Sequence, residues 1–230
     1  MYKRQLLENP TQFRELVGCL NYVAVSTRPD VAFALSFLGR YFANPTRQGL
    51  VYARDVLRYL VGSKEMKLRF GGVAASELVG FCDADWAGDP ESRRSTTGFA
   101  FLLNGGAISW SSKLQRTVAA SSVEAEYQSC SAAAREAIWL KRLLGDLGLD
   151  SSGALVLNTD SQGAIQLGRN PIVSPRSKHI DVQHHFVREC EANGVIMLRY
   201  CDTEHMIADV LTKALARVKL ERCRSGLGVC

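Results

Sequence analysis

Hydrophobic residues in the first third of the chain recur with the spacing of helices. Apolar positions three and four residues apart occur over residues 13–23, 31–42 and 52–60, and a proline precedes each of the first two runs. These runs predict three helices. The pair Gly71-Gly72 predicts a boundary after them.

From residue 77 onward the pattern becomes that of a sheet interrupted by helices. The predicted strands span residues 77–86, 97–104, 107–112, 154–160 and 195–200. The predicted helices span residues 121–147, 161–168, 179–190 and 205–218. The first three strands follow one another directly, with Gly105-Gly106 between the last two, and predict an antiparallel meander. Strands joined through helices pair in parallel, so the whole sheet is expected to be mixed.

The bulk composition is that of a globular intracellular protein. Of the 230 residues, 47% are hydrophobic and 22% are charged, which is enough to build a sizeable core. No apolar run approaches the roughly 20 residues of a membrane span. The first residues, MYKRQLLENPTQF, lack the apolar core of a secretory signal. Seven cysteines without a CxxC pair predict reduced thiols, with neither a disulfide framework nor a zinc site.

Positive charge is concentrated in the first third of the chain. Residues 1–75 hold 11 Lys/Arg and 5 Asp/Glu, a net charge of +6, whereas the remainder has a net charge of −1. A basic part that holds phosphate, joined to a part that holds metal, fits this distribution. A solvated basic surface accounts for the charge equally well.

Four acidic residues stand where a folded sheet could gather them. Asp83 and Asp160 end two predicted strands, Glu126 lies early in the long helix, and Asp209 lies in the last predicted helix. Clustered carboxylates repel one another unless cations neutralise them. Two Mg²⁺ ions about 3.5–4 Å apart would do so, with Mn²⁺ as an alternative, and such a centre hydrolyses phosphodiesters without a covalent intermediate.

Each aspartate also has a structural interpretation. Asp160 precedes Ser161 and could cap the start of a helix, and Asp209 could be a solvated helix residue. Asp83 competes with Asp85 and Asp89, any of which could be a turn residue.

Two glutamates compete for the helical position of the centre. Helical angle does not decide between Glu124 and Glu126, since apolar residues lie between them. Ser121 followed three residues later by Glu124 forms a capping box, which gives Glu124 a structural role. Glu126 is therefore the predicted ligand.

Taken together, these segments resemble the RNase H region of copia-type (Ty1/copia) retrotransposon polyproteins, over almost the whole chain. The matching stretches, in chain order, are LVGCLNYVAVSTRPDVAFALSFLGRYFANP, RDVLRYLVGS, VGFCDADWAGDPESRRSTTGFAFLLNGGAISWSSKLQ, SSVEAEY, TDSQGAIQLGRNP, RSKHIDVQHHFVRE and ADVLTKAL. The resemblance implies an α/β fold, a ribonuclease H-like mixed five-stranded sheet flanked by helices and preceded by a small helical segment. It implies a connection segment over residues 1–74, an RNase H-like domain over 75–218 and a tail over 219–230.

The resemblance also implies an activity and its residues. It implies hydrolysis of the RNA strand of RNA–DNA hybrids with divalent metal, beside the reverse transcriptase portion of the same polyprotein, in a cytoplasmic retrotransposon particle with a nuclear phase. The motifs FCDAD, AEY, TDS and AD place the four ligands at Asp83, Glu126, Asp160 and Asp209.

The chain departs from the family pattern in several places. No acidic polymerase motif occurs, Met206-Ile207 replace an Asn-Pro pair, and Ser161 replaces an asparagine. None of these changes removes a carboxylate. The missing polymerase motif leaves a competing hypothesis, a catalytically silent fragment that only binds nucleic acid through its basic first third.

Candidate contacts to nucleic acid surround the acids. Small polar side chains that could read 2′-hydroxyl groups are those of Ser121, Ser122, Asn158 and Thr159. Loop cations that could contact phosphate are those of Arg93, Arg94, Arg176 and Lys178. Roles as helix caps and strand ends are the simpler account of any one of the small polar residues, and a solvated loop is the alternative for the cations. Trp86, Trp110 and Trp139 could stack on bases, although Trp110 has the pattern of a core residue.

Overall fold

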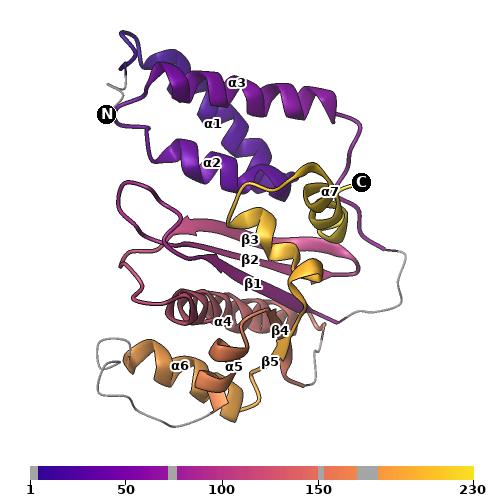
Figure 1. Ribbon diagram of the computed structural model, residues 1–230. Coiled ribbons are helices and arrows are strands. Elements are labelled where there is room, and N and C mark those ends of the chain that lie inside the picture. The colour runs from indigo at the N-terminus through magenta and orange to yellow at the C-terminus, as the bar shows by residue number, and fades with distance from the viewer. Residues whose placement is uncertain (1–4, 72–76, 150–152, 170–180) are drawn as a thin grey trace.

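A mixed five-stranded sheet lies between two layers of helices (Figure 1). The computed structural model describes residues 5–71, 77–149, 153–169 and 181–230. The strands are β1 (Val79–Asp85), β2 (Thr96–Leu103), β3 (Gly106–Leu114), β4 (Leu155–Thr159) and β5 (Ile196–Tyr200), in the order β3-β2-β1-β4-β5. The first three pair antiparallel, and β1, β4 and β5 pair in parallel. This is the ribonuclease H-like sheet that the resemblance implied.

A tight turn joins β2 to β3. Asn104 and Gly105 both have positive φ angles, of 51° and 78°. A two-residue hairpin turn of this kind favours Asn followed by Gly, because its twist matches that of the strands. The turn therefore lies one residue earlier than the predicted Gly105-Gly106.

Helices α4 (Ser122–Asp146), α5 (Gln162–Arg169) and α6 (Asp181–Ala192) cover one face of the sheet (Figure 1). The buried face of α4 is rich in small residues, among them Ala133, Ala134 and Ala137, each fully buried. Small side chains let the helix approach the sheet closely. Larger apolar residues such as Phe101, Leu157 and Leu198 complete this core, and each buried side chain of that size contributes about 1.5–3 kcal/mol.

The first third of the chain forms the helical layer on the other face. It comprises α1 (Thr11–Ser26), the short 3-10 helix η1 (Pro29–Val31), α2 (Ala32–Gly39) and α3 (Arg47–Gly62), which confirms the three predicted helices. These helices share a core of their own around Phe13, Leu35 and Leu38. Trp110 of β3 is half-buried, and its Nε1 donates a hydrogen bond of 3.0 Å to the Ala24 carbonyl. That bond ties the helical layer to the sheet.

The helix predicted over residues 205–218 is wrong. The chain instead forms two 3-10 helices, η3 (Thr203–His205) and η4 (Ile207–Leu211), and the α-helix α7 (Arg217–Gly226) begins later. Apolar residues spaced three and four apart fit either helix type. Here Ile207, Val210 and Leu211 belong to a third hydrophobic core, which they form with residues of the sheet. Asp209 therefore lies in a 3-10 helix that is docked on the sheet.

The last residues are part of the packed structure. The expected boundary at residue 218 falls inside α7, and Leu227 and Val229 beyond it are buried. Val229 also forms an isolated bridge with Leu68, just after the helical layer. Within the described ranges no helix is both long and apolar enough to cross a membrane. All seven cysteines are free thiols.

Candidate metal centre

Three carboxylates from three separate elements converge at one edge of the sheet. One oxygen each of Asp83, Glu126 and Asp160 lies within 4.8 Å of the others. The register of the parallel strands β1 and β4 pairs Phe81 with Asn158, so Asp83 and Asp160 each stand two residues further on. Parallel strands bring their carboxyl ends to the same edge, and the first turns of α4 place Glu126 over that edge.

Burial makes this group of acids electrostatically costly. Asp83 is 1% exposed, and burial raises its pKa to about 6, against the opposing effect of Lys213. Glu126 is 9% exposed, and burial together with the charge of Asp83 raises its pKa to about 10. The Glu126 Oε2 atom is buried without a hydrogen-bond partner among the described residues. An unpartnered oxygen beside two further carboxylates suits a hard divalent cation, which prefers such ligands.

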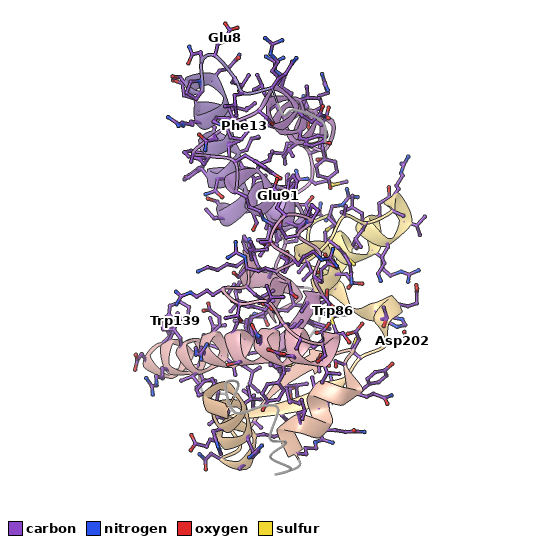
Figure 2. All side chains as sticks on the ribbon, turned by 60° about the vertical axis from the view of Figure 1, so that its left-hand side comes forward. Glu8, Phe13, Trp86, Glu91, Trp139 and Asp202 are labelled. Carbon is purple, nitrogen blue, oxygen red and sulfur yellow. The ribbon has the colours of Figure 1, made fainter. Side chains whose placement is uncertain are left out.

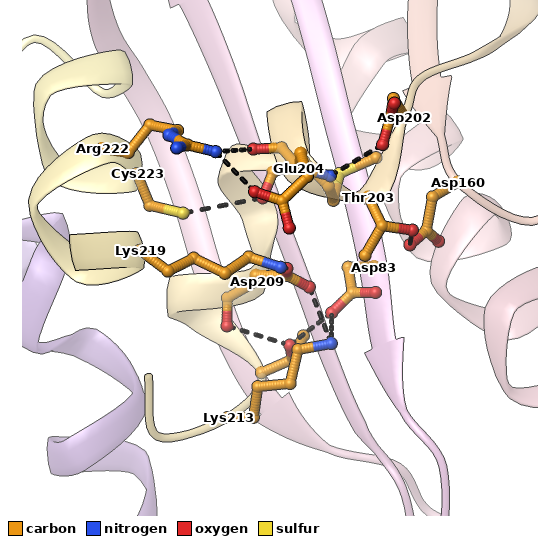
Figure 3. Close-up of polar contacts among 12 residues, drawn as sticks. Asp83, Asp160, Asp202, Thr203, Glu204, Asp209, Lys213, Lys219, Arg222 and Cys223 are labelled. Atoms are coloured by element: carbon orange, nitrogen blue, oxygen red, sulfur yellow. Dashed lines mark hydrogen bonds and ion pairs between the residues drawn. The ribbon is translucent and has the colours of Figure 1, made fainter. Parts of the chain in front are cut away.

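The fourth predicted ligand, Asp209, lies beside this triad and faces two lysines. Lys213 Nζ is 2.7 Å from Asp209 Oδ1, and Lys219 Nζ pairs with Oδ2 (Figure 3). Lys213 Nζ is also 3.4 Å from Asp83 Oδ2. The sequence prediction did not include these lysines. The spacing of four residues between Asp209 and Lys213 was the signal that could have found the first of them.

Two threonines support the triad, and the sequence prediction missed both. The Thr212 hydroxyl donates to Asp83 Oδ2. Thr203 Oγ1 donates a hydrogen bond of 2.8 Å to Asp160 Oδ2 (Figure 3). Hydrogen bonds of this kind fix the direction of a carboxylate and favour its charged form. Both threonines lie in or next to the 3-10 segments, far from their partners in sequence.

The competing aspartates have other surroundings. Asp89 accepts a hydrogen bond of 2.8 Å from the Ser92 backbone and pairs with Arg40 at 2.9 Å, so it organises the loop after β1. Asp85 is half-buried, and burial raises its pKa. Neither residue belongs to the group of converging oxygens, which contains Asp83.

The capping role of Ser121 at the start of α4 is confirmed, and the Glu124 side chain reaches back one residue beyond the N-cap, to Ala120. Ser121 Oγ accepts a hydrogen bond of 3.1 Å from the Glu124 backbone, and Glu124 Oε2 accepts one of 2.8 Å from the Ala120 backbone. Glu124 thus pairs with backbone groups at the helix start. Glu126 instead points toward Asp83 and Asp160 and completes the triad.

No family model matches the chain. It is 42% identical over 217 residues to the retrovirus-related Pol polyprotein from transposon TNT 1-94 of Nicotiana tabacum. It is 36% identical over 229 residues to the corresponding polyprotein from transposon RE1 of Arabidopsis thaliana. The chain belongs to the family of retrovirus-related Pol polyproteins from transposons. The alignments cover 94% and 100% of this chain but only 16% of each polyprotein, so the chain spans a small part of their length.

The resemblance to transposon polyproteins is therefore confirmed. Among solved structures, the chain is similar to LC11-RNase H1, isolated from compost by a metagenomic approach. The identity is 13% and the TM-score 0.47, and the superposition covers 60% of this chain and 94% of that chain.

The polar residues predicted to contact nucleic acid differ in their accessibility in this Pol segment. Asn158 is 3% exposed, and its amide donates to the Gly80 carbonyl and accepts from Arg199, both at 2.9 Å. Thr159 is fully buried. Both side chains are therefore structural parts of the sheet and offer no surface to a ligand. Ser121 and Ser122 are exposed at the start of α4.

The predicted cationic and aromatic contacts lie mostly on the surface. Arg93 is exposed and Arg94 half-buried in the loop between β1 and β2, and Arg176 and Lys178 lie outside the described residues. Trp86 is 50% exposed, and its Nε1 donates a hydrogen bond of 3.2 Å to the Ala119 carbonyl. Figure 2 shows it near one end of α4, with Trp139 near the other.

Proposed function

We propose that the chain hydrolyses the RNA strand of RNA–DNA hybrids, as the ribonuclease H portion of a transposon Pol polyprotein. One observation carries the proposal. Three carboxylates from β1, α4 and the end of β4 meet within 4.8 Å, and one buried oxygen among them has no hydrogen-bond partner in the described structure. The ribonuclease H-like sheet and the Pol relatives support the same function.

Asp83, Glu126 and Asp160 would hold the divalent cation, Mg²⁺ or Mn²⁺. When bound, such an ion supplies an activated water and stabilises the leaving oxygen of the phosphodiester. The protein supplies the geometry. Thr203 and Thr212 fix two of the carboxylates. Burial shields the bond between Thr212 and Asp83 from bulk water.

The hybrid would lie over the exposed residues that surround the triad. Ser121 and Ser122 present hydroxyl groups at the start of α4, and the indole of Trp86 is held in place by its bond to Ala119. Arg93 in the loop after β1 is a candidate phosphate contact. The exposed Arg47, Arg54 and Arg58 of α3, in the helical layer on the other face of the sheet, are candidates for contact with phosphates farther from the triad.

The partner would be the reverse transcriptase portion of the same polyprotein, since the Pol relatives extend far beyond this chain. Removal of the RNA strand would then accompany DNA synthesis on the same template. The location that goes with this proposal would be a cytoplasmic retrotransposon particle, with a nuclear phase.

The test is cleavage of an RNA–DNA hybrid labelled on the RNA strand, with Mg²⁺ and with a chelator, beside RNA and DNA duplexes. We expect metal-dependent loss of the hybrid's RNA strand only, and none from Asp160→Asn. Asp202→Asn is the matched control, because Asp202 is an exposed aspartate that caps η3, which asparagine also does. Salt-sensitive binding of the hybrid by a folded sample without cleavage would support the silent fragment instead.

A further inference from the structure

Two lysines lie against Asp209 beside the acidic triad, and neither is explained by hydrolysis with a pair of metal ions. Lys213 lies two residues after the end of η4, and Lys219 lies in the first turn of α7. Both contact Asp209, whose side chain is 0% exposed. Two cations from different elements therefore meet a single fully buried carboxylate (Figure 3).

Lys213 has the more informative position, because its ammonium group contacts two carboxylates. Its Nζ atom lies 2.7 Å from Asp209 Oδ1 and 3.4 Å from Asp83 Oδ2. A lysine side chain is an ammonium cation at neutral pH. Here that cation joins a member of the triad to the fourth acid.

A cation between two buried carboxylates neutralises their repulsion in the way a metal ion does. In a centre with two metal ions, the second ion needs carboxylate oxygens that are not already matched by charge. Here Glu126 and Asp160 have no lysine partner among the ion pairs of the described residues, whereas Asp209 has two. The carboxyl groups without a cationic partner among the described ion pairs are therefore in the triad, whereas Asp209 is already matched by two ammonium groups.

We propose that the Lys213 ammonium group serves as the cation between Asp83 and Asp209, so that the triad binds one divalent ion tightly and a second enters only when Lys213 withdraws. The inference rests on the proposed function, since that function makes the triad a metal site. It concerns the number of ions, however, and not the cleavage itself.

The side chain can withdraw without unfolding its surroundings. Lys213 lies two residues after the end of η4 and its side chain is 35% exposed, so its long methylene chain has solvent on one side. Lys219 would still pair with the other oxygen of Asp209. Lys213 is thus a positioning residue whose place a second ion has to take.

The test is titration calorimetry of Mn²⁺ into the whole folded chain, without nucleic acid. The wild type is expected to bind one ion tightly and any second ion at least tenfold more weakly. Lys213→Met is expected to tighten the second site by tenfold or more. Lys219→Met is the matched control, because it removes the same charge next to the same carboxylate. Lys213 still bridges Asp83 and Asp209 in this variant, so the number of tightly bound Mn²⁺ ions is expected to stay at one.

Lys213→Gln provides a second variant, because its amide can still donate to a carboxylate while the charge is gone. It is expected to tighten the second site as Lys213→Met does, with circular dichroism as the check on folding. Two equally tight ions in the wild type would overturn the inference and leave the proposed nuclease intact. So would an unchanged second site in both Lys213 variants. Absence of any Mn²⁺ binding would overturn the metal-dependent function as well.

Discussion

Arg224 of α7 donates a hydrogen bond of 3.0 Å to the hydroxyl oxygen of Tyr59 in α3, across 165 residues of sequence. The Tyr59 hydroxyl in turn donates to Asp30 at 2.7 Å, and Asp30 accepts two hydrogen bonds from Arg28, of 2.9 and 2.8 Å. Arg28 and Asp30 are both buried. Through these bonds the first helical layer and the last helix stabilise one another.

Arg28→Met is expected to destabilise the protein by about 3–5 kcal/mol, because it leaves the Asp30 carboxylate buried without its main partner. Arg58→Met is the matched control. Arg58 also pairs with an aspartate a few residues away, Asp55, but their side chains are 72% and 52% exposed, and such pairs contribute roughly 0–1 kcal/mol. Urea unfolding of both variants measures the difference. Equal losses would contradict the role of the buried network.

Glu126→Gln is expected to stabilise the chelator-treated protein at alkaline pH. The pKa of Glu126 is raised in the folded state, so the folded protein holds a proton that the unfolded chain releases. The contribution of Glu126 to the free energy of unfolding is full below the pKa of about 4.3 in the unfolded chain. It is lost as the pH rises towards the pKa of about 10 in the folded protein. The wild type should therefore lose up to about 1.4 kcal/mol per pH unit between pH 7 and 9.

Thermal unfolding in chelator between pH 5 and 9 tests this expectation. The Asp83 pKa is raised in the same direction but only to about 6. Buried thiols with raised pKa values affect the wild type and the variant alike, so the part of the slope above pH 7 that Glu126→Gln removes belongs to Glu126. Glu124→Gln is the control, since glutamine also completes a capping box, and it should keep the wild-type slope. If Glu126→Gln shows the same slope as the wild type, the Glu126 carboxyl group is not the source of the pH dependence of stability.

Gly98→Ala is expected to displace the segment that carries Asp209. A Cβ atom at Gly98 of β2 would lie 2.6 Å from Thr212 Cγ2 and 2.8 Å from Leu211 Cβ. Overpacking of this kind costs about 1–3 kcal/mol. Gly18→Ala in the exposed face of α1 is the control, because nothing lies within 4 Å of its added Cβ, and helix propensity favours alanine by about 1 kcal/mol. Both are measured by thermal unfolding, and a neutral Gly98→Ala would show that η4 can shift freely.

The seven thiols are expected to react with an aromatic disulfide reagent in distinct groups. Cys19 and Cys230 are exposed and should react first, followed by the half-buried Cys201. Four thiols are buried and should react only on unfolding: Cys82, Cys130, Cys190 and Cys223. A chromogenic assay with and without denaturant counts each group. Early reaction of more than three thiols would contradict the packing of the core.

The sequence by itself determined most of the helices and strands and the local capping motif. Strand and helix patterns are set by which residues face a core, and that periodicity is visible in the chain without knowledge of partners. The capping box of Ser121 and Glu124 is equally local, because its groups lie within one turn. It left Glu126 as the predicted ligand, and the structure brings that glutamate together with Asp83 and Asp160.

Only the tertiary structure decided what lies around the acids. The apolar spacing of residues 207–211 fits an α-helix and a 3-10 helix alike, and contact with β2 at Gly98 selects the second. Asn158 was predicted to contact nucleic acid. Its side chain is instead buried and forms hydrogen bonds with Gly80 and Arg199, which lie on the neighbouring strands. Lys213 and Lys219 meet Asp209 because the chain turns between η4 and α7. Such contacts depend on how elements dock, and a pattern of neighbouring residues carries no information about docking.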